Sequence, residues 1–280
     1  FPVRRPLPGE ADYDPYYAIP VAKILGGHRG RRRAFRPPSI VNISAMSFGS
    51  LSGNAIHALN AGSCLAGCLH NTGEGGVSPH HLQGGDLIWQ IGTGYFGCRD
   101  EQGNFSLAHL VETTNKHPSI RALEIKLSQG AKPGLGGILP ASKITPEISR
   151  IRGIPMGVDC ISPSSHSAFS DADSLLDFVE NIAEATGLPV GIKSAVGEMD
   201  LWHNLARLSD NTERGVDFIT IDGGEGGTGA GPLVFTDRVA LPFKIGMSRV
   251  YRVFAERGLH EKIVFQGSAK LGFPEMTLFA

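Results

Sequence analysis

The chain has 280 residues, with 26 Lys and Arg against 27 Asp and Glu, so its formal net charge is −1. This balance argues against a dedicated nucleic-acid binder, whose affinity comes mainly from a basic surface that faces phosphates. Glycine is the outlier, with 37 residues, about twice the average share of roughly 7%. The glycines cluster at the ends of apolar runs, which indicates loops where the backbone approaches a ligand.

The cellular location is predicted from two features. No apolar run approaches the roughly 20 residues that a membrane span needs. The start, Phe1 to Arg5, looks like an internal one, so a removed N-terminal targeting segment or membrane anchor stays an open alternative. Cys64 and Cys68 lie one helical turn apart, but no second pair with ligand spacing follows. We interpret the four cysteines as buried structural thiols without a metal, in a reducing and therefore cytoplasmic compartment.

The first 38 residues are rich in Pro, Tyr and Arg and show little periodicity. We predict that residues 1–38 form an extended lead-in that wraps a domain formed by residues 39–280. The basic run His28 to Arg33 has the composition of a nucleic-acid or anionic-lipid patch. We favour a solvated segment or a contact with a neighbouring acidic region.

From residue 39 on, short apolar runs alternate with helical stretches. The predicted strands are 40–48, 68–71, 123–127, 156–161, 189–194, 218–221 and 263–265. The predicted helices are 52–65, with Ser52 as its N-cap, 173–185, 200–214 and 239–257. Strands that alternate with helices form parallel sheets. Polar and glycine-rich loops follow six or more strands rather than one switch point, so we predict an α/β fold, a (β/α)8 TIM barrel.

The end of the chain predicts an incomplete barrel. Residues 274–280 read as the opening of a helix, and no eighth strand follows them. An open barrel of seven strands would leave two bare edges. We therefore expect that the barrel is truncated before the eighth strand and that the sequence is a fragment.

Two early loops carry candidate chemistry. Ser44 to Ser52 consists mostly of small residues after a strand, which would let backbone groups reach a planar ring edge-on, although an ordinary tight turn has the same composition. Asn71 to Gly76 places Glu74 between glycines at a strand end. There a carboxylate can bind an amine or an activated water, and a charged surface turn is the alternative.

Three lysines lie in or shortly after later predicted strands and are candidates for binding an anion. Lys126 and Lys132 are six residues apart, and Lys126 lies inside an apolar strand, so the two can converge on a dicarboxylate or on an anionic ring. Strand alternation places Gly191 and Lys193 on one face, and a lysine at that strand end can stabilise negative charge on a bound ring.

Two glycine-bearing segments complete the predicted pocket. Residues 221–232 include six glycines within ten residues, which excludes a helix or strand interior and fits a pocket wall lined by backbone. Residues 267–270 lie between a predicted strand and a helix, where backbone donors and a helix N-terminus suit a phosphate. The seventh strand of a barrel is a usual place for such a site.

Long motifs in a fixed order resemble a known family, the FMN-binding synthase domain of glutamate synthases, in its short single-domain bacterial and archaeal form. The matching stretches within residues 36–280 are SAMSFGSLS, NTGEGG, EIKLSQGAKPGLGG, GVDCISPSSHSAF, PVGIKSAVGE and DGGEGGTGAGP. The resemblance implies an FMN-dependent oxidoreductase that acts on CH–NH2 donors. Such an enzyme reduces a 2-imino acid, formed from 2-oxoglutarate and ammonia or an amine, to L-glutamate.

The resemblance also implies roles for individual residues. The expected catalytic residues beside the oxo-acid are Glu74, Lys126 and Lys132. The expected FMN-binding residues, the last three of them at the phosphate, are Ala45, Met46, Ser47, Gln129, Lys193, Gly226, Gly227, Gly267, Ser268 and Lys270.

Departures from the family pattern leave the substrate open. Ile138 stands where the larger enzymes carry a glutamine positioned to bind the oxo-acid, and Leu135 replaces a glutamate. Residues 164–168 replace a Pro-Pro-His-His-Asp run. The family's cysteines for a 3Fe–4S cluster lie downstream, so the ligands of any such cluster would lie beyond residue 280. The implied partners are ferredoxin or a reductase subunit as electron donor and, for ammonia, solution or a glutaminase subunit.

Three alternatives stay open. One is an N-alkylglutamate synthase subunit, which would use an amine in place of ammonia. Another is a different FMN barrel oxidoreductase; a 2-hydroxy-acid oxidase would need a His/Arg pair, yet neither residue occurs between Phe218 and Asp237. The last is a non-catalytic electron-transfer or scaffold subunit, because a fold does not guarantee chemistry.

Overall fold

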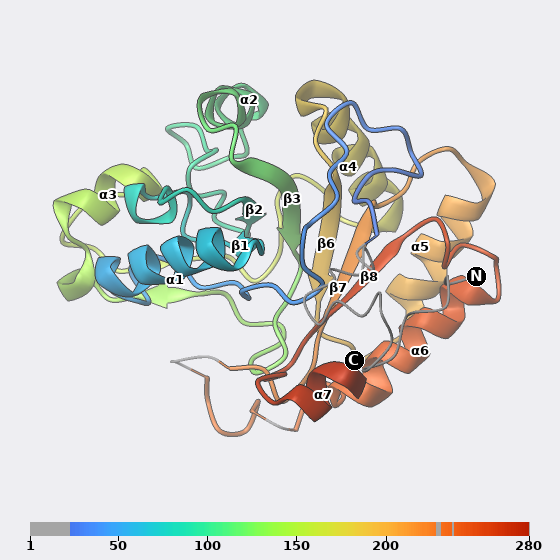
Figure 1. Cartoon of the computed structure of the whole chain (residues 1–280). Helices are drawn as coiled ribbons and strands as arrows, with labels where there is room; N and C mark the ends of the chain where they lie inside the picture. Colours follow the sequence, from blue (N-terminus) through green and yellow to red (C-terminus); the bar gives the residue numbers. More distant parts are fainter. Residues whose placement is uncertain (1–22, 228–230, 237, 280) are drawn as a thin grey trace, which may run out of the picture.

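A computed structural model describes residues 23–227, 231–236 and 238–279 (Figure 1). Its main sheet has six parallel strands in the order β1-β2-β3-β6-β7-β8. Their bounds are β1 His70–Asn71, β2 Leu87–Ile91, β3 Ile120–Lys126, β6 Val190–Ser194, β7 Phe218–Asp222 and β8 Val264–Ser268. Parallel neighbours require crossover connections, and helices supply most of them.

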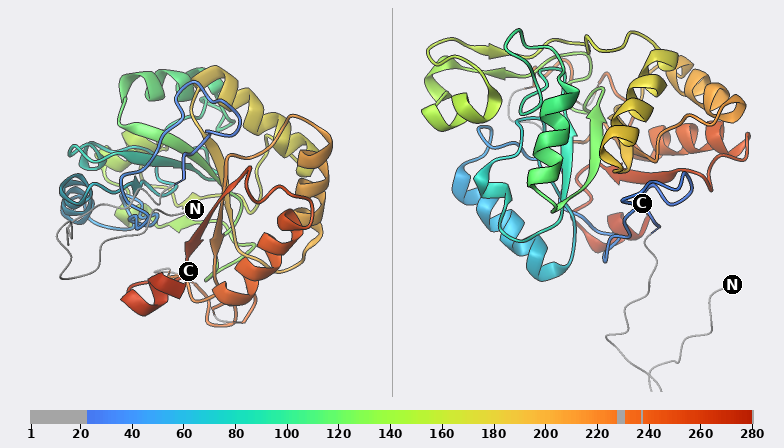
Figure 2. Two further views of the ribbon diagram at one scale, coloured as in Figure 1. Left: turned by 45° about the vertical axis from the view of Figure 1, so that its right-hand side comes forward. Right: turned by 90° about the horizontal axis from the view of Figure 1, so that it is seen from above.

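Helices cover the outside of this curled sheet (Figures 1 and 2). They are α1 Gly53–Ala66, α2 Leu107–Lys116, α4 Ala172–Thr186, α5 Asp200–Asn211, α6 Phe243–Ala255 and α7 Pro274–Phe279, with a 3-10 turn η1 at Pro79–His81. Ser52 accepts a hydrogen bond from the backbone N–H of Ala55 and so caps α1 as predicted. The predicted α/β barrel architecture is confirmed. None of the described helices is long and apolar enough to cross a membrane.

The described strands leave the barrel open between β1 and β8, and one short segment touches both edges. Ile43 forms an isolated parallel bridge with His70 of β1. The hydroxyl of the next residue, Ser44, lies 3.1 Å from that of Ser268 in β8. The predicted strand 40–48 is wrong in extent. Its pairing with β1, which has only two residues, is limited to the bridge between Ile43 and His70.

Two other differences concern short apolar runs. The strand β2 was not predicted, although all five of its residues are buried. The predicted barrel strand 156–161 is wrong: only Cys160–Ile161 is extended, and this β5 pairs antiparallel with β4 at Ile138–Leu139, outside the barrel. Helices α2 and α3 (Pro146–Arg152) were also not predicted.

The antiparallel pair belongs to an excursion between β3 and α4 that we call the arm, residues 131–162. It contains β4, the 3-10 turn η2 at Ala141–Lys143, α3 and β5. The arm lies at the periphery, on the same side as α1 (Figures 1 and 2). A small apolar cluster attaches it to the loop after Ile43 and to α1: Phe48, Ile56, Leu139, Ile144 and Ile148.

The barrel interior is layered. At the amino ends of the strands, one apolar cluster consists of Leu25, Leu69, Ile88, Ala122 and Phe218. Two residues further along β3, the buried carboxylate of Glu124 accepts three hydrogen bonds, from Asn71 (2.8 Å), Gln90 (2.7 Å) and Thr220 (2.7 Å). Charged residues follow at the carboxyl ends. The inner face therefore changes from apolar to polar to charged along the strands.

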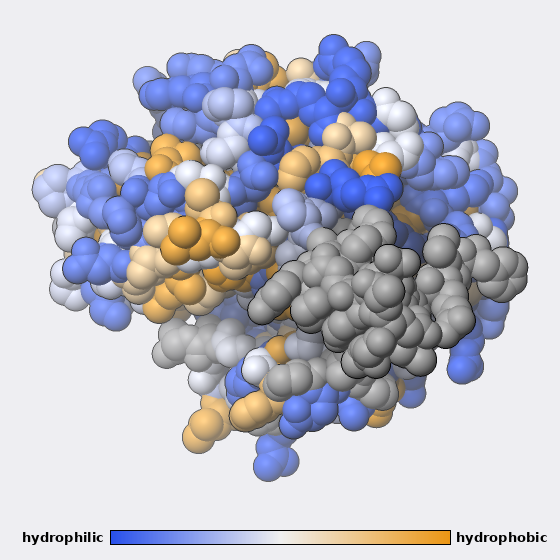
Figure 3. Space-filling model, in the orientation of Figure 1, coloured by the Kyte–Doolittle hydropathy of each residue, from blue (hydrophilic) through white to orange (hydrophobic). Residues whose placement is uncertain are grey.

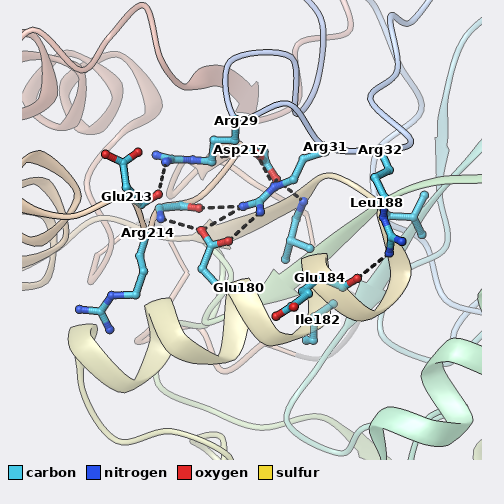
Figure 4. Close-up of polar contacts among 12 residues, drawn as sticks. Arg29, Arg31, Arg32, Glu180, Ile182, Glu184, Leu188, Glu213, Arg214 and Asp217 are labelled. Carbon is cyan, nitrogen blue, oxygen red and sulfur yellow. Dashed lines mark hydrogen bonds and ion pairs between the residues drawn. The ribbon is translucent and has the colours of Figure 1, made fainter.

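The segment before the barrel closes its apolar end. Leu25 and Phe35 exchange two backbone hydrogen bonds, and Leu25 is buried in the interior cluster. The basic run then contacts α4 and the start of β7 (Figure 4). Arg31 binds Glu180 and Asp217. The favoured interpretation of this run, a contact with an acidic region, is thus confirmed, while residues 1–22 lie outside the described part and the boundary at residue 38 stays a prediction.

The surface carries apolar residues on the side where α1 and the arm lie (Figure 3). Exposed examples are Ile40, Val41, Leu65, Ile138 and Ile161, of which Leu65 is 91% exposed. The prediction of four buried cysteines is wrong for three of them: Cys98 is buried, Cys64 is exposed, and Cys68 and Cys160 are intermediate. The cysteine pattern misled because an apolar sequence neighbourhood does not specify burial: Cys64 lies on an exposed face of α1, Cys68 follows that helix, and Cys160 lies in β5, outside the barrel.

Candidate active site at the carboxyl ends of the strands

One large cavity, of about 1820 Å³, extends from Leu25 and Ile88 near the amino ends of the strands to the residues at their carboxyl ends. Typical ligand pockets measure roughly 300–1,000 Å³, so there is room for a large cofactor together with a substrate. Every candidate residue from the sequence lines this cavity: Ala45, Met46, Ser47, Glu74, Lys126, Gln129, Lys132, Lys193, Gly226, Gly227, Gly267, Ser268 and Lys270.

Glu74 and Lys126 form an ion pair in this cavity. Their Oε1 and Nζ atoms lie 3.0 Å apart, and the same Nζ donates to Oε1 of Gln129 at 2.7 Å. Burial alone would raise the pKa of Glu74, but Lys126, then Lys132 and Arg152, bring this pKa below its ordinary value. Glu74 is therefore ionised at neutral pH.

Arg152 is a site residue that the sequence did not reveal. It ends α3 of the arm and is only 7% exposed. Its Nη2 donates to the carbonyl of Phe48 at 3.0 Å, and its guanidinium carbon lies 5.1 Å from the ring centre of Phe96. Its position four residues after Ile148, on the buried side of the helix, was the available signal.

The charges around Glu74 do not balance. Lys126, Lys132 and Arg152 together carry +3 and Glu74 carries −1, which leaves +2 in this part of the cavity. Lys132 is 9% exposed, and its Nζ has a weak contact of 3.5 Å with the carbonyl of Gly136. Burial, and then repulsion by Lys126, lower the pKa of Lys132. A bound anion with two charges would neutralise the surplus.

A second ion pair lies deeper, between neighbouring strands. Lys193 of β6 lies 3.7 Å from the carboxylate of Asp222 at the end of β7. Asp222 also accepts a hydrogen bond of 2.8 Å from the backbone N–H of Gly130. The side chain of Asp222 therefore fixes both Lys193 and the loop that carries Gln129.

The loop of small residues packs against a glycine that needs its conformation. Gly73 has φ +66°, a value that favours glycine. A Cβ at Gly73 would lie 2.6 Å from the backbone nitrogen of Ser47 and 2.9 Å from the carbonyl carbon of Met46. The close approach of the two loops therefore requires glycine at this position.

The opposite wall is glycine-rich. A Cβ at Gly227 would meet no atom within 4 Å, so the wall faces open space there. Glu225 turns away from it, and its carboxylate accepts a hydrogen bond of 2.9 Å from the backbone N–H of Phe243, at the start of α6. This contact anchors the start of the loop, whose residues 228–230 lie outside the described part.

The predicted phosphate segment differs from expectation in one respect. Gly267 and Ser268 are the last two residues of β8, and Lys270 has φ 57°. The next helix, α7, begins only at Pro274, so a helix N-terminus does not follow the segment directly. Backbone and side-chain donors remain available in the cavity.

The fold and the site define an α/β barrel protein with a large cavity that reaches the carboxyl ends of its strands and surplus positive charge within it. The chain belongs to the glutamate synthase family: residues 31–276 match the conserved region in glutamate synthase.

Curated relatives agree with this assignment. The chain is 38% identical over 269 residues to the glutamate synthase large subunit-like protein YerD of Bacillus subtilis, covering 95% of this chain and 51% of that protein. It is 37% identical to an archaeal-type glutamate synthase [NADPH] of Thermotoga maritima, covering 78% and 40%. The glutamate synthase [NADPH] large chain of Bacillus subtilis is 31% identical, with 81% and 14% covered. The chain thus spans about half the length of YerD and less of the others.

Solved structures are only remotely similar. A mandelate racemase/muconate lactonizing enzyme from Roseiflexus shares 13% identity with a TM-score of 0.33, covering 81% of this chain and 47% of that one.

Proposed function

We propose that this chain is the FMN-binding catalytic part of a glutamate-synthase-type oxidoreductase, which reduces a 2-imino acid derived from 2-oxoglutarate to L-glutamate. The observation that carries the proposal is the surplus of two positive charges around Glu74 in a barrel of this family. It favours a substrate with two carboxylates and, beside them, a nitrogen that Glu74 can bind.

The substrate end of the cavity is built from two parts. Arg152 and Lys132 belong to the arm, and Lys126 and Glu74 belong to the barrel. An arginine binds a carboxylate through two parallel hydrogen bonds, and a buried Nε of Arg152 has no partner among the described residues. We assign Arg152 and Lys132 to the substrate carboxylates. Glu74, held ionised by Lys126, accepts a hydrogen bond from the substrate nitrogen.

FMN fits the remainder of the cavity. The loop Ala45 to Ser47 and the wall at Gly226 and Gly227 line it, and apart from Met46 these residues are small, which leaves room for a planar ring. Lys193, buried at a strand end, suits the ring's negative edge, beside Gln129. The phosphate would be held by Gly267, Ser268 and Lys270.

The proposed reaction adds a hydride to C2 of the imino acid and a proton, taken from solvent, to its nitrogen. Reduced FMN would supply the hydride. Lys132 and Arg152 orient the carbon chain so that one face of C2 points into the cavity. Glu74 stabilises the charge on the protonated nitrogen. We propose that electrons reach this chain from ferredoxin or a reductase subunit, and that ammonia or an amine comes from solution or a glutaminase subunit.

The first experiment is a visible absorption spectrum of the purified protein before and after addition of FMN. Flavin bands near roughly 370 and 450 nm, at about one FMN per chain, are expected. The variant Lys193→Ala should bind FMN more weakly. A colourless protein that ignores FMN would contradict the proposal.

The second experiment measures 2-oxoglutarate binding by calorimetry. Arg152→Ala should lower the affinity by about 10- to 100-fold, since a hydrogen bond to a charged group contributes roughly 1.5–3 kcal/mol. Arg150→Ala, an exposed arginine on the same helix, is the matched control and should change little. Equal losses in the two variants would refute the assignment of Arg152.

A further inference from the structure

A buried tyrosine collects hydrogen bonds from the segment that returns from the arm. The hydroxyl of Tyr95, in the loop after β2, accepts hydrogen bonds from the backbone N–H groups of Ser167 (3.0 Å) and Ala168 (3.1 Å). It also lies 3.2 Å from Nδ1 of His166. The other ring nitrogen of His166, Nε2, lies 2.9 Å from the carbonyl oxygen of Lys126.

These contacts determine where the protons are. A carbonyl oxygen only accepts, so Nε2 of His166 carries a proton and donates it to Lys126. Both lone pairs of the Tyr95 oxygen are occupied by backbone N–H groups, so its own proton goes to Nδ1 of His166. Every polar atom of the two side chains is thereby satisfied. Burial lowers the pKa of His166, which keeps the ring neutral as this arrangement requires.

The pair is held in a rigid environment. Tyr95 is only 1% exposed and has φ 49°, an uncommon backbone conformation for an aromatic residue. Its ring packs edge-on against Phe105, with centroids 5.6 Å apart, and the ring of His166 stacks on Phe169 at 4.7 Å. Thr93, from the same loop, donates a hydrogen bond of 2.7 Å to the carbonyl of Pro163. The loop after β2 therefore binds the segment that follows the arm through two residues, Thr93 and Tyr95.

The pair joins the two halves of the substrate end. Lys126 is the last residue of β3 and pairs with Glu74 on the barrel side. Lys132 and Arg152 belong to the arm, which ends just before Pro163 and His166. Other contacts between the barrel and the arm include the small apolar cluster around Phe48, the contacts of Arg152 and the pair formed by His80 and Glu147.

We propose that Tyr95 and His166 are positioning residues that fix the distance between the barrel pair Glu74 and Lys126 and the arm cations Lys132 and Arg152, and thereby select the length of the dicarboxylate. This inference rests on the proposed function, because it assumes that Glu74 contacts the substrate beside C2 while the arm cations hold its carboxylates. Neither side chain touches the substrate. Their effect passes through the Lys126 carbonyl and through the backbone of residues 166–168.

The test compares binding of three diacids with chains of four, five and six carbons: oxaloacetate, 2-oxoglutarate and 2-oxoadipate. The FMN-loaded wild-type protein should prefer one length by about tenfold or more over its neighbours, the discrimination that one methylene provides. Tyr95→Phe removes only the hydroxyl and should reduce this preference below the roughly tenfold that one methylene provides in a well-defined site. A loss of folded protein would weaken all three affinities equally and leave the ratio unchanged.

Two substitutions of His166 keep the test decisive if the variant Tyr95→Phe folds poorly. His166→Gln keeps a donor within reach of the Lys126 carbonyl and should retain most of the preference, whereas His166→Leu should lose it. Unchanged ratios in Tyr95→Phe and His166→Leu would overturn the inference. If the wild type binds none of the diacids, the proposed function fails. Hydrogen exchange of residues 127–132 then decides, with faster exchange in Tyr95→Phe expected and an unchanged rate refuting the positioning role of Tyr95 and His166.

Discussion

The contact of the basic segment with the barrel gives a prediction whose size follows from geometry. Nε of Arg31 lies 3.0 and 3.2 Å from the two carboxylate oxygens of Asp217, and its Nη1 and Nη2 lie 2.6 and 3.0 Å from the oxygens of Glu180. The side chain of Arg31 is 11% exposed and that of Asp217 is fully buried. The variant Arg31→Ala would leave a buried carboxylate without its principal partner.

Removing one partner of a buried ion pair costs about 3–5 kcal/mol of folding free energy. Nε of Arg29 lies 4.0 Å from Asp217 and stays as a second cation, and the backbone N–H of Val190 donates to the same carboxylate. We therefore expect the lower end of that range, about 3 kcal/mol. Burial raises the pKa of Asp217 despite the arginines, so part of this loss should be recovered at acidic pH, where the carboxyl is protonated.

The assay is urea unfolding followed by circular dichroism, with Arg214→Ala as the matched control. Arg214 pairs with Asp173 and Asp177, which belong to the same helix as Glu180, but those carboxylates are 61% and 68% exposed. Exposed pairs contribute at most about 1 kcal/mol. Equal losses for the two variants, or a loss below about 1 kcal/mol for Arg31→Ala, would refute the reasoning.

Two further predictions concern pH and the glycines around Glu74. Burial lowers the pKa of both His70 and His81 from 6.5 to about 4, so the unfolded chain binds protons first, and the free energy of unfolding should fall as pH drops from 6.5 to 4. His81→Asn should flatten that fall in pH-dependent urea titrations, and an unchanged slope would contradict the assignment. At Gly92→Ala, the new Cβ would lie 2.5 Å from Oε2 of Glu74, so 2-oxoglutarate affinity should drop by about tenfold. Calorimetry checks this against Gly197→Ala, whose Cβ meets nothing within 4 Å; similar affinities in both would exclude the clash.

The sequence predicted the helices and strands whose local residue pattern is unambiguous. Helices with clear amphipathic faces, such as α4 and α5, and strands that end in chemically distinctive loops, such as β6, were found. The five-residue run of β2 was missed because a short apolar run does not distinguish a strand from a buried helix segment. Met156 to Ile161 is another short, partly apolar run, but the strand within it pairs with the arm rather than with the barrel. Pairing is set by tertiary contacts that one sequence does not show.

The sequence likewise predicted one part of the candidate site and missed another. Residues in glycine-rich motifs at strand ends were identified, and all of them line one cavity. Arg152 was missed because it lies in a helix 26 residues after Lys126, and only the fold of the arm brings it near Glu74. Ile138 was expected to matter as a replacement for a glutamine. It pairs with Ile161 and is 62% exposed, while Leu139, on the other face of β4, is buried.

The contacts of Arg31 have a consequence for the order of events during synthesis. Its two partners lie 149 and 186 residues later in the chain. At roughly 5–20 residues per second, the ribosome needs about 10 to 40 seconds to supply Asp217 after Arg31. Until then Arg31 lacks the buried carboxylate of Asp217, which it binds in the folded protein. The closing of the barrel's apolar end is therefore a late step, available only after β7 has emerged.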